Sequence, residues 1–164
     1  MKNITQPIGG IMGYISGSGT KSAARISALA ASALVLGGAS LPAVSVDVSL
    51  TNLRSTKGQV LVCLTANPKQ FPDCTDDNKA VRMAVDADHA ARFSIAAPGP
   101  GTYAIALVHD ENANNKMDMR LFLPREGFGF SRNPAIGMGA PKFSSASFKV
   151  SGETAQTIKM KYML

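Results

Sequence analysis

The sequence contains no tryptophan, only two cysteines and only two histidines among its 164 residues. This scarcity argues against a structural zinc site, which needs several cysteine or histidine ligands close together. No apolar run reaches the roughly 20 residues that a membrane-spanning helix requires. No cluster of arginine and lysine interleaved with aromatic residues is present either, so the sequence predicts no nucleic-acid partner.

Acidic residues are absent from the first 45 positions, which contain three basic residues. A short apolar segment, 26–39, follows these and leads into small residues at Ala43 and Ser45. This order is typical of a secretory signal peptide cleaved before Val46. We therefore predict a signal peptide at 1–45 and a periplasmic or secreted mature protein without a transmembrane anchor. Met12 is an alternative start of translation.

The net charge of +6 comes largely from this leader. Three of the 17 basic residues and none of the 11 acidic residues lie in it, which leaves 14 basic against 11 acidic residues. The high isoelectric point is therefore poor evidence for nucleic-acid binding. Residues 46–164 have the length of one domain, and we predict a single domain there.

Apolar residues alternate with polar ones through 46–164, whereas helical periodicity is hard to find. Glycine, proline and other turn-forming residues separate the alternating runs at 55–59, 97–102 and 150–154. The predicted strands are 46–53, 59–65, 80–86, 91–97, 102–108, 147–150 and 157–164. This pattern predicts an all-β fold, a single antiparallel sandwich of about seven strands. A small closed barrel is the alternative, because alternation alone does not distinguish closed sheets from stacked ones.

The connection 110–142 interrupts this rhythm, since only "RLFLP" at 120–124 resembles a strand. Connections this long in compact domains are usually functional or disordered, and the phenylalanines here argue against disorder. Phe122, Phe128 and Phe130 lie within the connection, and Phe143 directly follows it. We expect the connection to fold back over one end of the sandwich, with these four phenylalanines as its packing anchors.

Cys63 lies in a predicted strand, and Cys74 lies in a turn-like segment eleven residues later. Two cysteines so placed in an exported protein favour a disulfide bond. We predict a Cys63–Cys74 disulfide, with an unpaired core thiol as the alternative. The neighbouring sequence offers neither the histidine or further cysteine that a metal site would need nor a partner that would activate a thiol.

The segment "HDENANNKMD", 109–118, spaces oxygen-bearing residues as calcium-binding loops do. The predicted ligands are Asp110, Asn112, Asn114, the carbonyl of Lys116 and Asp118. Asn115 stands where such loops have glycine, and Leu121 stands where they have a bidentate glutamate. These departures predict a weak calcium site, completed by Glu126 or water. The alternative is a loop whose Asp and Asn side chains cap its own backbone without metal.

His109 and Asp110 would need to face each other to act as base and orienter, yet neighbours on a strand point to opposite faces. We therefore predict no catalytic residue and no organic cofactor. A hydrolase of cell-envelope polymers that uses His109, Asp118 or Glu126 is the alternative. Sugar binding by stacking is poorly supported, because residues 46–164 contain only two tyrosines, although Phe128 and Phe130 could serve if exposed.

Four segments carry a resemblance to a known family. They are "GTYA" (101–104), "HDENANNKMD" (109–118), "PREGFGFS" (124–131) and "PKFSSASF" (141–148). Together they resemble an uncharacterised family of small exported bacterial proteins, domain of unknown function 2141, and "PGPGTYAIAL" resembles the strand entry of transthyretin-like sandwiches. The resemblance implies an immunoglobulin-like or prealbumin-like sandwich and no established activity. The family pattern often has glycine at positions 113 and 115, which implies a stiffer loop here.

These observations favour an exported, non-catalytic binding or accessory module of the cell envelope. Its expected partner is an envelope protein or polymer whose identity the sequence leaves open, as it does the oligomeric state. The expected working surface is the connection 110–142, ordered by a weakly bound calcium ion.

Overall fold

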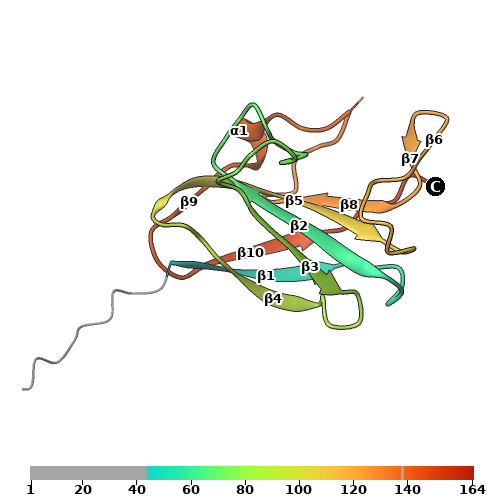
Figure 1. Cartoon of the computed structure of the whole chain (residues 1–164), viewed down its shortest axis with the longest axis horizontal. Coiled ribbons are helices and arrows are strands. Elements are labelled where there is room, and N and C mark those ends of the chain that lie inside the picture. Colours follow the sequence, from blue (N-terminus) through green and yellow to red (C-terminus); the bar gives the residue numbers. More distant parts are fainter. Residues whose placement is uncertain (1–43, 138) are drawn as a thin grey trace, which may run out of the picture. The chain divides into compact units, whose positions relative to one another are not determined.

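The computed structural model describes residues 44–137 and 139–164 (Figure 1). The predicted signal peptide lies outside the described residues, apart from Val44 and Ser45, and stays a prediction. The strands of the described chain are β1 (Ser45–Thr51), β2 (Gln59–Thr65), β3 (Val81–Asp86), β4 (Arg92–Ala96), β5 (Gly101–Asp110), β6 (Met119–Arg120), β7 (Leu123–Pro124), β8 (Gly127–Phe130), β9 (Phe148–Val150) and β10 (Thr154–Lys159). A single turn of helix, α1 (Phe143–Ala146), precedes β9. None of the described helical residues forms a segment long and apolar enough to cross a bilayer.

Two sheets form the layers of a β-sandwich (Figure 1). One has the strand order β10-β1-β4, and the other has the order β3-β2-β5-β8, with β9 paired to the first residues of β5. Alternate residues of each strand point inward, so apolar side chains from both sheets meet in one core. The central members of this core are Val46, Val48, Val60, Leu64, Ile95, Ile105, Leu107 and Ile158. The all-β sandwich prediction is confirmed, and the sheets do not close into a barrel.

One strand pair departs from the prediction of an antiparallel sandwich. β10 pairs with β1 in parallel, with Val46 opposite Thr154 and Thr51 opposite Lys159. β10 also begins three residues earlier than predicted and ends at Lys159. Apolar alternation reports which face a residue occupies but not the direction of its neighbour, so the sequence could not predict this parallel pair.

Strand β8 lies within the connection 110–142, where the sequence predicts no strand at 127–130. Glycine weakens a strand, so "GFGF" gave little signal. Both glycines are nevertheless required by packing. A Cβ atom on Gly127 would lie 2.2 Å from Cε1 of Tyr162, and one on Gly129 would lie 2.8 Å from Cγ2 of Ile158. The glycines therefore let the C-terminal segment pack directly on β8.

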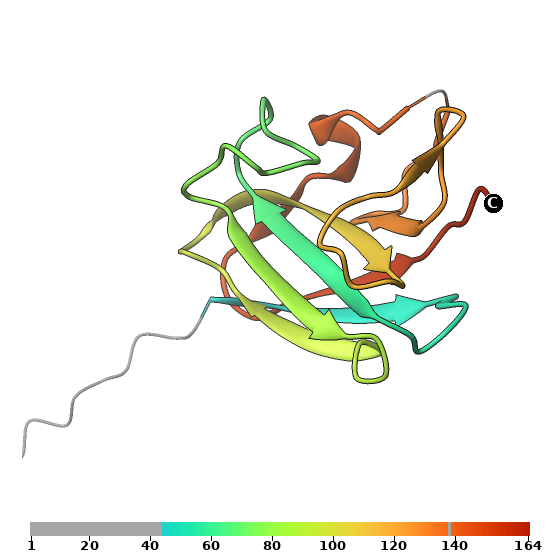
Figure 2. The ribbon, with the colours of Figure 1, turned by 45° about the vertical axis from the view of Figure 1, so that its right-hand side comes forward.

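The four phenylalanines expected as packing anchors divide into two groups. Phe128 and Phe130 are buried in a second apolar cluster on the outer face of the β3-β2-β5-β8 sheet, and Phe143 packs against that cluster. Phe122 is 95% exposed, so the prediction that it anchors the loop is wrong. It lies in the turn of a small β6–β7 hairpin, which projects beside the sandwich (Figure 2).

The structure contains the predicted Cys63–Cys74 disulfide. Both cysteines are buried, and the bond attaches the segment 66–80 to β2. Within this segment Phe71 packs edge-on against Phe130 and Phe143, with ring centroids 5.8 and 5.9 Å apart. The disulfide therefore holds part of the cover of the second apolar cluster in place.

Replacing both Cys63 and Cys74 with alanine should lower the free energy of unfolding by about 2 to 3 kcal/mol, the chain-entropy value for a loop of this size. Urea denaturation measures this loss. A reducing agent should destabilise the wild-type protein by a similar amount and leave the double variant unchanged. A loss below about 0.5 kcal/mol would contradict a stabilising role for the disulfide.

Candidate metal centre

Asp110 is the last residue of β5, and strand geometry determines where its side chain points. His109 faces the core and Asp110 the opposite side of the sheet, because neighbouring residues alternate. Gln59, the first residue of β2, lies opposite Asp110 in the register. The Nε2 group of Gln59 donates a hydrogen bond of 2.9 Å to Oδ2 of Asp110. Two core strands therefore fix this carboxylate, which is fully buried.

The loop after β5 turns back onto the Asp110 carboxylate. The backbone N–H of Asn114 donates to Oδ1 at 3.1 Å, and that of Asn115 donates to Oδ2 at 2.7 Å. Ala113 and Asn115 adopt left-handed φ values of 56° and 64° to make this turn. Burial works to raise the pKa of Asp110, but the hydrogen bonds from Gln59 and the loop N–H groups outweigh it and lower the pKa. Asp110 is therefore held ionised.

The two asparagines of the predicted ligand set lie next to Asp118. The Nδ2 group of Asn112 donates to Oδ2 of Asp118 at 2.7 Å, and that of Asn114 donates to Oδ1 at 3.1 Å. Their Oδ1 atoms accept the backbone N–H groups of Asn114 at 3.1 Å and Lys116 at 3.0 Å. This is the self-capped arrangement that the sequence analysis named as the alternative to a metal loop. Rotating either amide by 180° would present oxygen rather than nitrogen to Asp118.

Lys116 was predicted to contribute its backbone carbonyl. That oxygen accepts no hydrogen bond from the residues that the structure describes, whereas the Lys116 N–H is bonded to Asn114. Four of the five predicted ligands, Asp110, Asn112, Asn114 and Asp118, are thus joined by hydrogen bonds in one loop.

Glu126 reaches the same place from the next strand. β5 and β8 pair antiparallel with His109 opposite Gly127, so continuing the register by one residue places Glu126 opposite Asp110. Glu126 is only 4% exposed. Its Oε2 atom accepts the backbone N–H of Asp118 at 3.1 Å, and its Oε1 atom is buried with no hydrogen-bond partner in the described part of the chain.

The electrostatics of this group are unfavourable without a counterion. Burial raises the pKa of Glu126, and the carboxylates of Asp110 and Asp118 raise it further, against the opposing effect of the Asp118 N–H bond. Like charges opposite each other on paired strands destabilise a sheet. Either a proton on Glu126 or a cation beside its unpartnered oxygen relieves this repulsion.

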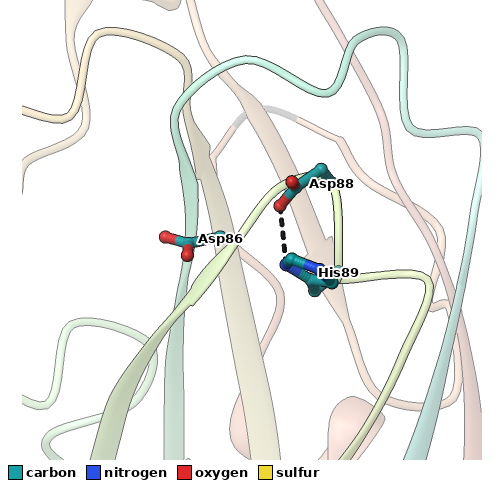
Figure 3. Close-up of side chains that lie close together, drawn as sticks. All are labelled: Asp86, Asp88 and His89. Carbon is teal, nitrogen blue, oxygen red and sulfur yellow. Dashed lines mark ion pairs between the residues drawn. The ribbon is translucent and has the colours of Figure 1, made fainter.

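Another group of possible ligands, Asp86, Asp88 and His89, lies around the turn after β3 (Figure 3). In the described part of the chain this is the one group of three acidic, histidine or cysteine side chains with ligand atoms all within 4.8 Å of one another. All three side chains are exposed, and Nδ1 of His89 pairs with Oδ1 of Asp88 at 2.9 Å. An exposed side-chain contact of this kind needs no metal.

The carboxylates of Asp110, Asp118 and Glu126 are less tightly gathered than that exposed group. The amides of Asn112 and Asn114 engage Asp118 instead. A bound cation would therefore require Asp118 to move toward Asp110 and Glu126.

Arg54, which belongs to none of the sequence motifs, joins several parts of the site. Its guanidinium forms an ion pair with Glu111 and lies 4.4 Å from the centre of the Tyr162 ring. It also donates to the carbonyls of Arg125 at 3.1 Å and Leu164 at 2.6 Å. The hydrogen bond from Arg54 lowers the pKa of Glu111. These contacts connect the loop after β5, the residue that follows β7 and the C-terminal residue. No local sequence signal points to them.

His109 is not arranged as a catalytic base. Its side chain is fully buried, with Nε2 3.0 Å from the carbonyl of Lys57 and Nδ1 2.8 Å from the hydroxyl of Tyr162. A carbonyl only accepts, so Nε2 carries the proton and Nδ1 accepts from Tyr162. Both ring nitrogens are thus engaged and neither reaches the surface. Phe128 and Phe130 are buried as well, so they offer no exposed platform for a sugar.

Two hollows adjoin the loop. One of about 460 Å³ is lined by Asn112, Asp118 and Glu126 together with Arg54, Arg120 and Arg125. The other, of about 580 Å³, lies over the outer face of the β3-β2-β5-β8 sheet, and the loop residues Asn115, Lys116 and Met117 form part of its wall. The loop therefore contributes to the walls of both hollows.

Comparison with known proteins returned one family. The family model described as an uncharacterized protein conserved in bacteria (DUF2141) matches residues 48–159. No curated protein and no solved structure matches the chain.

Proposed function

The chain belongs to this family of uncharacterised bacterial proteins, and we propose that it is an exported, non-catalytic binding module of the cell envelope whose long loop is ordered by calcium. The proposed ligands are the carboxylates of Asp110, Asp118 and Glu126, the side-chain oxygens of Asn112 and Asn114, and the carbonyl of Lys116. Its partner is an envelope protein or polymer.

The observation that carries the proposal is the buried, unpartnered Oε1 atom of Glu126 beside Asp110. A buried carboxylate oxygen normally has a hydrogen-bond donor, and leaving it without one is costly. Here the neighbours are other acids rather than donors. A cation at this oxygen would also attract the carboxylates of Asp110 and Asp118, whose charges raise the pKa of Glu126.

The donor set favours calcium over other metals. All six proposed ligands offer oxygen, which hard cations prefer, whereas zinc and copper select nitrogen or sulfur. The ligands come from one loop and one strand start, a flexible arrangement that suits calcium better than the strict octahedron of magnesium. Glu126 supplies the acid that the loop itself lacks at its twelfth position.

The ion would act by fixing the loop rather than by chemistry. Asn115, Lys116 and Met117 line the 580 Å³ hollow on the outer sheet face, so ordering the loop shapes one wall of a ligand-sized groove. His109 is buried and both of its ring nitrogens are hydrogen-bonded, which supports a non-catalytic role. The hydrolase alternative would have to operate with Asp118 and Glu126 alone, which line the 460 Å³ hollow.

Thermal unfolding with and without calcium tests this proposal. At a calcium concentration ten times the dissociation constant, binding stabilises the fold by about 1.4 kcal/mol, which should raise Tm by about 5 °C. Asp118→Asn should remove most of the rise, because it removes one charged ligand. Asp88→Asn, in the exposed group of Figure 3, is the matched control and should keep it. An absent rise, or an equal rise in Asp118→Asn, would refute the site.

A further inference from the structure

The large apolar side chains that the described chain exposes gather at one place. They are Met119, Leu121, Phe122, Leu123, Met163 and Leu164. The first four belong to the β6–β7 hairpin and its turn, and the last two are the C-terminal residues. The hairpin and the C-terminus lie side by side in both views (Figures 1 and 2). Apolar residues concentrated in this way mark an interaction surface, whereas scattered ones do not.

The backbone of the hairpin holds two of these side chains out into solvent. Arg120 pairs with Leu123, so Leu121 and Phe122 form a two-residue turn. Both have left-handed φ values, 48° and 68°, which bulky residues rarely adopt. Leu121 is 84% exposed and Phe122 is 95% exposed. The tip therefore presents two large apolar groups that have no role in packing the domain.

Positive charge flanks the tip. The segment 119–125 contains Arg120 and Arg125 and no acidic residue. Within 44–137 and 139–164, neither guanidinium has a hydrogen-bond or ion-pair partner, unlike that of Arg54. Both side chains line the 460 Å³ hollow at the base of the hairpin, whose wall also includes the acids Glu111, Asp118 and Glu126. The surface thus combines a narrow apolar tip with two arginines, Arg120 and Arg125, at the base of the hairpin.

We propose that the β6–β7 hairpin docks the protein peripherally on an anionic phospholipid bilayer, with Leu121 and Phe122 entering the acyl boundary and Arg120 and Arg125 contacting lipid phosphates. An interfacial anchor needs apolar side chains that reach the acyl boundary and basic residues that attract the charged headgroups. A protein partner would need about 800 Å² of surface on each side, which a hairpin tip of four apolar residues does not supply by itself. None of the four residues that make this contact is a proposed calcium ligand.

A tryptophan at position 122 reports on this contact directly. The chain has no tryptophan, so Phe122→Trp introduces a single fluorophore at the tip. Its emission should shift to shorter wavelength when vesicles of phosphatidylcholine and phosphatidylglycerol are added, in buffer with EDTA or with calcium. Ala155→Trp is the control, because Ala155 is exposed near the start of β10, which lies away from the hairpin (Figure 1). Both variants keep residues 1–43, so any contact made there is common to them.

A second experiment removes the positive charges of Arg120 and Arg125. Arg120→Gln with Arg125→Gln, placed in the Phe122→Trp chain, should weaken binding to these vesicles about 25-fold, since each basic residue at an anionic surface contributes about fivefold. Lys149→Gln, an exposed charge on β9, should leave binding unchanged. If the emission of the Phe122→Trp variant did not shift with vesicles in either buffer, the proposal would be overturned and a protein partner favoured. An equal shift with pure phosphatidylcholine, or with inorganic phosphate alone, would also overturn it.

Discussion

Replacing Gly58 with alanine should destabilise the protein by about 4 kcal/mol, well above the usual effect of a surface substitution. Gly58 has a φ of +71° in the turn between β1 and β2. A Cβ atom there would lie 2.0 Å from the carbonyl oxygen of Asp110 and 2.7 Å from Cα of Glu111. Both obstacles are backbone atoms at the end of β5, so no side-chain rotation relieves the clash. The cost combines left-handed strain with forced displacement of the strand end.

The displaced strand end carries Asp110, so Gly58→Ala should also reduce the thermal response to calcium. Urea denaturation measures the loss of stability. Gly99→Ala is the matched control, because a Cβ atom there meets nothing within 4 Å, and it should change stability by less than about 0.5 kcal/mol. A Gly58→Ala protein within about 1 kcal/mol of wild type would contradict the close approach of this turn to β5.

Replacing Glu126 with glutamine should have opposite effects on the ion-free and calcium-loaded protein. Without calcium the variant should be more stable by about 0.5 to 1 kcal/mol, because a neutral amide removes the repulsion among three acids. The variant should bind calcium more weakly, by about a hundredfold or more. Even residues that only hydrogen-bond to a metal ligand contribute about 10- to 100-fold to metal affinity. Parallel thermal melts and calorimetric titrations measure the two effects.

Glu153→Gln is the control for a change of net charge, because Glu153 is exposed in the turn before β10 and should leave both quantities unchanged. If Glu126→Gln lost stability without calcium, the carboxylate would be stabilising by itself. If it bound calcium as wild type does, Glu126 would not be a ligand.

The pH dependence of the ion-free protein has a definite sign for this group. The folded-state pKa of Glu126 is raised above the ordinary value of 4.5, so the folded protein holds this proton more tightly than the unfolded chain does. The ionised Glu126 carboxylate destabilises the fold to its full extent above the raised pKa. This destabilisation is relieved as the pH falls through the raised pKa toward 4.5. Wild type should therefore gain stability relative to Glu126→Gln over that interval. A constant difference would contradict the raised pKa.

Features that depend on local sequence were predicted well. β2 has the predicted bounds, because Val60, Val62 and Leu64 alternate without interruption between turn signals. The Cys63–Cys74 disulfide followed from the number and placement of the cysteines. Asp110, Asn112, Asn114 and Asp118 are linked by hydrogen bonds within one loop, while their role as calcium ligands stays a prediction.

Features that depend on pairing between distant segments were not predicted. The parallel partner of β1, the strand "GFGF" and the contacts of Arg54 with Glu111 and the C-terminus all require knowledge of which segments meet. Phe122 was assigned to packing because phenylalanine is usually buried, whereas a two-residue turn holds it outside. Glu126 was named only as an additional ligand or a hydrolytic acid, since its place opposite Asp110 follows from the β5–β8 register.

A crystal structure of the protein grown with calcium tests the central claim most directly. The account predicts one ion within about 2.3 to 2.6 Å of oxygens from Asp110, Asp118 and Glu126, with the amides of Asn112 and Asn114 turned so that oxygen faces the ion. The Asp118 carboxylate would have moved toward Asp110 and Glu126, away from the position in which Asn112 and Asn114 donate hydrogen bonds to it. A structure with saturating calcium in which Asn112 and Asn114 still cap Asp118, and no ion touches Glu126 Oε1, would contradict it.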